Sequence, residues 1–151
     1  MRINPKDLLL VSIQLLLFIV YSIDFEWLLG YSYWLKIVGL TIAILGLLVV
    51  ILAILQLNKN LSPFPTPKHN SVLLQNGLFK LVRHPIYTRL IFHFFGYRIY
   101  QDSKYKLINT LLLIILFHYK TKYEDKQLQN KFPDYKHTNP KQVSFFLNCF
   151  N

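Results

Sequence analysis

The chain has 151 residues, of which 53% are hydrophobic and 16% are charged, and its formal net charge is +10. A water-soluble domain of this length covers its surface with more charge, so the composition argues against that class. The apolar residues are gathered in long runs, which indicates a single all-α membrane domain over residues 1–151. The basic residues flank these runs without forming a known nucleic-acid-binding motif, so we expect membrane lipids, not nucleic acid, as their partners.

Two apolar segments come first in the chain. The first, over about residues 8–23, follows a basic start but has no small-x-small cleavage site after it, which favours a retained helix over a signal peptide. The second, over about 34–57, is long enough to span the hydrocarbon core with some tilt. Gly39, Ala43 and Gly46 are spaced within it so that a neighbouring helix can approach closely.

The third and fourth segments, over about residues 86–100 and 107–132, are less apolar. The third carries Arg89, His93 and Arg98, each of which is costly when it faces lipid. We therefore expect a helical hairpin packed on the earlier segments, and the sequence leaves open whether this hairpin crosses the membrane completely. The prediction is a polytopic protein with about four transmembrane or membrane-embedded helices and an amphipathic C-terminal helix in the cytoplasm.

The distribution of charge predicts an orientation. Residues 24–33, between the first two segments, include two acids and no lysine or arginine, whereas the connection 58–85 and the C-terminal tail are rich in lysine. Positive residues are retained on the cytoplasmic side, so we expect both termini and the connection 58–85 to be cytoplasmic. Cys149 is the only cysteine, and no Cys/His spacing resembles a zinc site, so no metal is expected.

The connection 58–85 is longer than a hairpin needs. Its stretch LSPFPTPK has three prolines, which hold the chain stiff and extended. The following NSVLLQNGLFKLV places apolar residues around an Asn-Gly pair suited to a tight turn. An ordered, apolar connection of this kind predicts a pocket wall or lid beside the membrane.

The stretch VRHPIY and one acidic pair carry the chemistry. Pro85 suits the first turn of a helix, where its missing N–H is not needed. Arg83 and His84 then lie at the positive end of the helix dipole, which disfavours cations and indicates a purpose other than capping. The alternative is that Arg83 only reflects the excess of positive residues on the cytoplasmic side of membrane proteins. Glu124–Asp125 is the only pair of adjacent acids in the chain.

The order SPFPTPK, LLQNGLFKLVRHPIYT and KTKYEDKQLQNKFPDY resembles a family of integral membrane methyltransferases. This family includes isoprenylcysteine carboxyl methyltransferase and the bacterial phospholipid methyltransferase-like proteins. Its pattern is a Gly-x-aromatic, an Arg-His-Pro-x-Tyr, a helical hairpin, and then paired acids followed by leucine and phenylalanine. The resemblance covers about half of the chain and is closer to the bacterial members, which implies an integral protein of a bacterial inner membrane.

The resemblance implies an S-adenosylmethionine site between the connection 58–85, the start of the third helix and the tail. The absence of a Gly-rich strand-to-helix turn argues against a soluble, Rossmann-like methyltransferase. Carboxylates and electron-rich rings suit a sulfonium and an ammonium. The cofactor-binding residues carried over from the motif are Leu73, Leu74, Phe79, His84, Tyr87, Glu124 and Asp125.

The substrate that the resemblance implies is a lipophilic or membrane-delivered small molecule. Arg83 is the candidate catalytic residue, and Arg83 or a tail lysine such as Lys120 or Lys122 is a candidate for holding an anionic acceptor. Arg89 stands where the family commonly has a small residue, and Thr138 and Ser144 also depart from its pattern. The alternative is therefore a noncatalytic protein of the same scaffold that binds lipid or a partner.

Overall fold

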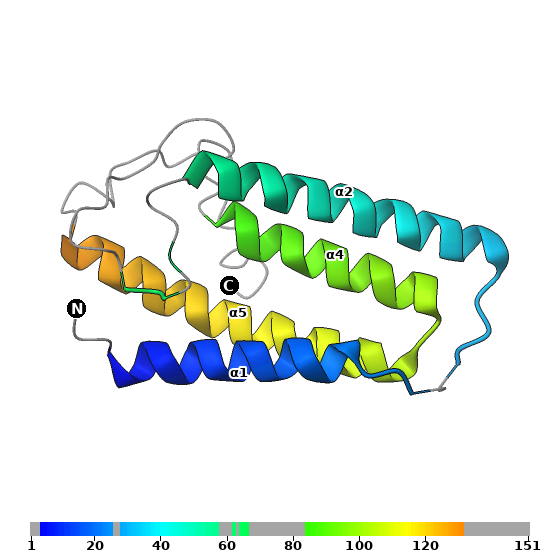
Figure 1. The fold of residues 1–151 in the computed structure, drawn as a ribbon, viewed down its shortest axis with the longest axis horizontal. Helices are drawn as coiled ribbons and strands as arrows, with labels where there is room; N and C mark the ends of the chain where they lie inside the picture. Colours follow the sequence, from blue (N-terminus) through cyan, green and yellow to red (C-terminus); the bar gives the residue numbers. More distant parts are fainter. Residues whose placement is uncertain (1–3, 26–27, 58–61, 63, 67–83, 132–151) are drawn as a thin grey trace, which may run out of the picture.

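The computed structural model describes residues 4–25, 28–57, 62, 64–66 and 84–131, and the helices within them are shown in Figure 1. The all-α prediction is confirmed for these residues, and each predicted segment contains one helix. The helices begin and end within three residues of the predicted positions, and they are α1 (Pro5–Ser22), α2 (Tyr33–Leu57), α4 (Pro85–Gln101) and α5 (Lys104–Lys131).

The helices run along one long axis, with α2 packed on α4 and α1 packed on α5 (Figure 1). The start of α1, the end of α2, the start of α4 and the end of α5 lie together, and we call this the His84 end. The two connections α1–α2 and α4–α5 lie at the opposite end, which we call the Asp102 end. As expected, α4 and α5 form a hairpin, and each of its helices covers one of the earlier helices.

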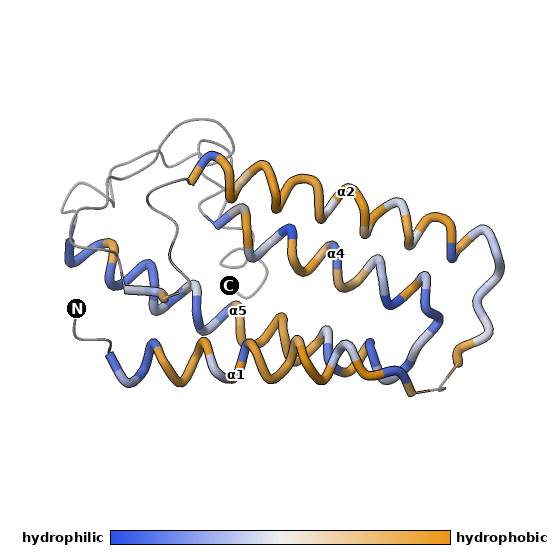
Figure 2. The backbone as a smooth tube through the Cα atoms, viewed as in Figure 1, coloured by the Kyte–Doolittle hydropathy of each residue, from blue (hydrophilic) through white to orange (hydrophobic). Residues whose placement is uncertain are grey.

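Two of the described helices, α1 and α2, are long and apolar enough to cross a membrane by length and composition. Large apolar side chains cover their outward surfaces, and Leu55 in α2 is 67% exposed. Apolar colour extends along most of α2 in Figure 2. Such a continuous apolar surface is costly in water and suits contact with lipid tails, so the protein associates with a membrane.

Small residues allow α2 and α4 to approach until their backbones touch. Gly39, Ala43 and Gly46 are buried, as predicted. A Cβ atom placed on Gly96 of α4 would lie 2.5 Å from the Ala43 nitrogen and 2.6 Å from the Gly39 oxygen. The His93 ring also bonds this backbone, with Nδ1 2.9 Å from the Ala43 oxygen. This close contact fixes α4, and with it the position of His84.

The polar residues of α4 that would be costly in contact with lipid instead contact other side chains of the protein. Arg98 is buried, its guanidinium lies 4.8 Å from the centre of the Phe95 ring, and it donates to the Tyr31 hydroxyl at 3.3 Å. Arg89 lies over the Phe92 ring at 5.5 Å. The tail residues 119–131 continue α5 without a break, so the fourth segment and the tail form one helix.

Asp102 joins the two connections at the Asp102 end. It has a left-handed backbone with φ 57°, which aspartate tolerates, and it ends α4. Its carboxylate accepts from the N–H groups of Leu29, Gly30 and Tyr31 at 2.9–3.1 Å, and Lys36 lies 3.2 Å away. One buried side chain therefore satisfies three backbone donors that precede α2.

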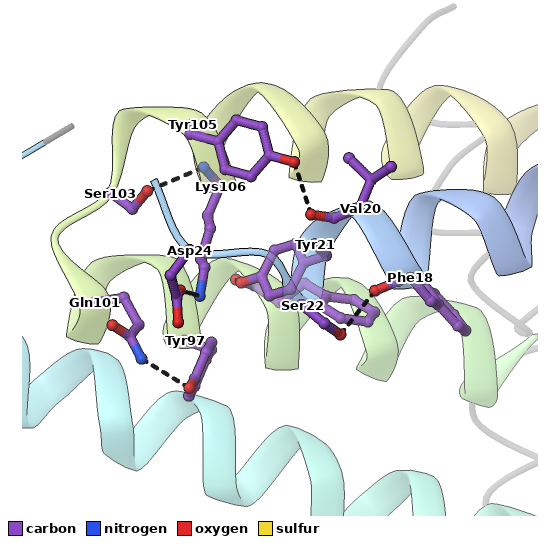
Figure 3. Close-up of polar contacts among 11 residues, drawn as sticks. Phe18, Val20, Tyr21, Ser22, Asp24, Tyr97, Gln101, Ser103, Tyr105 and Lys106 are labelled. Carbon is purple, nitrogen blue, oxygen red and sulfur yellow. Dashed lines mark hydrogen bonds and ion pairs between the residues drawn. The ribbon is translucent and has the colours of Figure 1, made fainter. Parts of the chain in front are cut away.

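The end of α1 is fastened to α5 close by. The ammonium of the buried Lys106 pairs with Asp24, and the Tyr105 hydroxyl donates to the Val20 oxygen at 2.7 Å (Figure 3). The same ammonium lies 5.4 Å from the centre of the Tyr21 ring and 5.0 Å from that of Tyr97. These contacts hold α1 in register along α5.

We expect Asp102→Asn to lower the thermal stability and to weaken its dependence on acid. Burial alone would raise the pKa of Asp102, but hydrogen bonds from Tyr31 and Leu29 and the charge of Lys36 outweigh it and hold the pKa below its usual range. The stabilisation is present above the ordinary aspartate pKa of about 3.9 and is lost as pH falls through the lower folded value. Melting curves between pH 3 and 7 test this, and parallel curves for variant and wild type would contradict it.

Candidate functional site

His84 occupies the N-cap of α4 but does not cap it. Pro85 is the first helical residue, as predicted, and the His84 side chain makes no capping hydrogen bond. Its backbone oxygen accepts from the Thr88 hydroxyl at 3.1 Å, which holds the first turn. The buried imidazole is therefore available for contacts with another helix.

The imidazole bridges the two adjacent acids of α5. Its Nε2 lies 2.9 Å from Asp125 Oδ1, and its Nδ1 lies 3.6 Å from Glu124 Oε2. Neighbouring residues on a helix point about 100° apart, and the two ring nitrogens allow one side chain to reach both. The acids also explain why a basic residue is tolerated beside the positive end of the α4 dipole.

Aromatic rings continue this contact into the bundle. The His84 and Tyr87 rings stack with centres 5.9 Å apart, and Tyr87 stacks on Phe117 at 5.2 Å. Tyr87 and the Glu124 carboxylate also interact electrostatically. The Lys120 ammonium lies 5.3 Å from the centre of the Tyr87 ring. The result is an acidic and aromatic cluster with a cation against it.

The electrostatics of Glu124 differ from those of a solvated acid. Its side chain is 26% exposed, but its Oε2 atom is buried and has no hydrogen-bond partner among the described residues. Burial raises the pKa of Glu124 above its usual range, and the opposing interactions with His84, Tyr87 and Lys120 do not fully offset this. The ionised carboxylate therefore costs folding free energy where it stands.

Helix α1 also reaches the cluster. Lys120 donates to the Gln14 amide oxygen at 2.6 Å, and the charge of Asp7 also acts on Lys120. The Asn4 amide donates to the Tyr123 hydroxyl at 3.0 Å, which places Glu124 level with the start of α1 and beyond its apolar part. The cluster therefore lies at the His84 end of the bundle, beside the first half of α1.

Four of the seven predicted cofactor-binding residues lie in the part of the chain that the structure describes. His84, Tyr87, Glu124 and Asp125 come together from two helices, although they are up to 41 residues apart in the sequence. The other predicted residues lie outside the part of the chain that the structure describes, and they are Leu73, Leu74, Phe79 and the catalytic candidate Arg83.

Sequence reasoning missed the contributions of α1 and of Phe117. Asp7 and Gln14 are seven residues apart and so share one face of a helix that is otherwise apolar over most of its length. Polar residues on one face of a membrane helix indicate a buried contact, and this signal was available before the structure. Phe117 carries no such signal, because it stands in a run of apolar residues.

The donor set of the cluster fits a cationic ligand. Two adjacent carboxylates, one with a buried oxygen that lacks a hydrogen bond among the described residues, favour a sulfonium or an ammonium. The fold and the cluster together define an all-helical, membrane-associated protein with an acidic, aromatic site at one end of the bundle.

A family model described as phospholipid methyltransferase matches residues 34–135. Because this match covers about two thirds of the chain, the chain belongs to the phospholipid methyltransferase family, a family of methyltransferases. The resemblance inferred from the motifs is thus confirmed. A search of curated proteins and a search of solved structures each found no match.

Proposed function

We propose that this protein transfers a methyl group from S-adenosylmethionine to a lipophilic or membrane-delivered small substrate at the cytoplasmic face of a membrane. The observation that carries the proposal is the contact of His84 with both Glu124 and Asp125. These residues resemble the family's motif, lie within the matched range 34–135, and come from helices that meet at the site. Their chemistry suits the positive charge of this cofactor.

Methyl transfer is a displacement in which the acceptor attacks along the line of the bond that breaks. Bound S-adenosylmethionine supplies an electrophilic methyl group on sulfur. The acceptor's lone pair forms the new bond to carbon, the electron pair of the broken bond stays on sulfur, and an acceptor N–H or O–H loses its proton. The reaction depends mainly on alignment, so the chain has to hold both reactants close and exclude water.

Each described residue of the cluster has a role in this proposal. Glu124 binds the positive end of the cofactor, and Asp125 holds the His84 imidazole in place through the 2.9 Å contact. His84 and Tyr87 offer ring faces and edges to the cofactor beside that charge. Together they position the donor at the His84 end of the bundle.

Arg83 precedes His84 directly in the chain, and we propose that it holds an anionic group of the acceptor. We expect Arg83→Ala to lower turnover about tenfold or more while leaving cofactor affinity nearly unchanged, because it removes a charge-assisted contact to the acceptor alone. Arg89→Ala is the matched control, because the Arg89 guanidinium already lies over Phe92. Unchanged turnover by Arg83→Ala on an identified substrate would remove Arg83 from the site.

We also propose that the His84 end is cytoplasmic in a bacterial inner membrane and that all four described helices are membrane-embedded. Lys122, Lys126 and Lys131 lie near the end of α5, next to the cluster, and support this orientation. The Asp102 end carries acids and the lysines Lys36, Lys104 and Lys106, of which Lys36 and Lys106 are paired with Asp102 and Asp24. Accessibility of single cysteines placed at each end, after Cys149→Ser, would test the orientation.

Calorimetry of the purified protein in detergent with S-adenosylmethionine tests the proposed activity. We expect the wild type to bind and Glu124→Ala to bind far more weakly. A folded wild type that does not bind would overturn the enzymatic proposal and leave a noncatalytic member of the same scaffold. Retained binding by Glu124→Ala would instead show that the cofactor lies elsewhere.

A further inference from the structure

Helix α1 carries a buried acid that the methyltransferase motifs do not include. Asp7 is 2% exposed and stands in the first turn of α1, which precedes the family match at residues 34–135. It acts electrostatically on Lys120, the residue whose ammonium lies against the Tyr87 ring. Asp7 is therefore near enough to Lys120 for their charges to interact, and it stands in the helix whose Gln14 bonds Lys120 and which this family match does not cover.

The carboxylate of Asp7 is incompletely satisfied. Its Oδ1 is buried without a hydrogen-bond partner among the described residues, and no ion pair within 4 Å joins it to them. An acid in the first turn interacts favourably with the helix dipole, but an acid exposed to water would gain the same interaction without the cost of burial. A buried carboxylate that lacks a direct cation is costly, which indicates a missing partner.

The charge balance of the cluster agrees with a missing cation. Its described residues include the carboxylates of Asp7, Glu124 and Asp125, against Lys120 and the imidazole of His84. With all three acids ionised, these described groups together keep a negative charge even when His84 is protonated. Lys120 also has the Gln14 amide as a hydrogen-bond acceptor, so Asp7 does not depend on it alone.

We propose that Asp7 is a second cation-binding carboxylate of this site and that its Oδ1 accepts a hydrogen bond from an ammonium group of a bound ligand. This inference rests on the proposed function. An ammonium is present in the amino-acid part of S-adenosylmethionine and also in the headgroup of an amine-bearing lipid. Both sources supply the same chemistry, and two sets of measurements separate them.

The first set of measurements uses calorimetry of the full chain in detergent. If the cofactor supplies the ammonium, Asp7→Asn lowers the affinity for S-adenosylmethionine about tenfold or more, as expected for a lost hydrogen bond to a charged group. The affinity for methylthioadenosine, which lacks the amino-acid part, stays unchanged. Asp7→Glu restores part of the loss, because it keeps the charge.

The second set of measurements uses native mass spectrometry of the full chain with added phosphatidylethanolamine or phosphatidylglycerol. If the lipid supplies the ammonium, Asp7→Asn lowers retention of phosphatidylethanolamine about tenfold and leaves that of phosphatidylglycerol unchanged. Asp24→Asn, at the opposite end of the bundle, is the control for both sets, and because Asp24 pairs with Lys106 its melting temperature is measured first to show that the variant is folded.

The outcomes distinguish this inference from the proposed function. A folded Asp7→Asn that binds every probe as the wild type does would overturn the role of Asp7, even when the wild type binds the cofactor. A wild type that does not bind S-adenosylmethionine would overturn the proposed function, and the lipid measurement would still decide Asp7. If Asp7→Asn unfolds while Asp7→Glu is stable, Asp7 is a structural residue and the inference is wrong.

Discussion

Glu124→Gln is expected to weaken cofactor binding and to stabilise the protein at the same time. Glutamine keeps the shape of the side chain but removes the negative charge that we propose binds the cofactor, so the affinity should fall about tenfold or more. Burial raises the pKa of Glu124, which means that the ionised form is unfavourable in the folded state. Removing that charge should therefore raise the melting temperature.

The sign of the pH dependence follows from the same pKa. The folded state holds the Glu124 proton more tightly than the unfolded state, so the free energy of unfolding contributed by this group falls as pH rises from about 4.3 through the raised value. Cofactor affinity should rise over the same interval as the carboxylate ionises. Both dependences should be absent in Glu124→Gln, which calorimetry and melting curves across this interval can measure.

Asp125→Asn is the matched control for Glu124→Gln. Asp125 directly contacts His84 Nε2 at 2.9 Å, so its loss should destabilise the junction of α4 and α5 instead of stabilising it. Opposite changes in melting temperature for two neighbouring acids would support separate roles in binding and in structure. A Glu124→Gln protein that is less stable and binds the cofactor normally would show that Glu124 is structural.

Gly96→Leu is expected to have the largest effect on the fold. The first atom of any side chain at this position would meet the backbone of α2, 2.5 Å from the Ala43 nitrogen and 2.6 Å from the Gly39 oxygen. Backbone atoms cannot rotate away, so α2 and α4 must separate along their contact. Overpacking a core typically lowers the free energy of unfolding by about 1–3 kcal/mol. Because the leucine would clash with backbone atoms, we expect a loss of at least the upper part of that range.

Thermal unfolding in detergent, followed by circular dichroism, measures this effect. Gly30→Ala is the control, because its Cβ meets no atom within 4 Å and only its φ of 81° resists the change, at about 1 kcal/mol. Gly96→Leu should also weaken cofactor binding, since it displaces the helix that begins at His84. Equal melting temperatures for Gly96→Leu and the wild type would show that the two helices do not pack as described.

The helices of this protein could be predicted because their cause is local. Apolar runs of membrane length, the Pro85 start and the small residues Gly39, Ala43 and Gly46 all follow from neighbouring letters in the chain. Two helix starts lie three residues before the predicted segments: that of α1, where Asn4 caps the helix and Pro5 opens it, and that of α5 at Lys104. A helix start made of polar residues cannot be predicted from the apolar run alone.

All seven candidate cofactor-binding residues came from the sequence, and four of them lie in the part of the chain that the structure describes. The spacing of His84 and Tyr87 from Glu124 and Asp125 matched a family pattern, and the structure brings these four together. The sequence contains no measure of the distance between them, because a contact across a helical hairpin depends on the helix axes. The predicted roles of the four residues remain proposals.

By itself, then, the sequence determined which segments are helical, which surfaces are apolar and which family the chain resembles, because each depends on local composition and spacing. Only the tertiary structure decided that α1 packs on α5 and brings Asp7 and Gln14 to Lys120. It also showed that His84 bridges two acids instead of capping α4. Such contacts join residues about 40 to more than 100 positions apart, and their energies depend on burial and geometry that no local pattern contains.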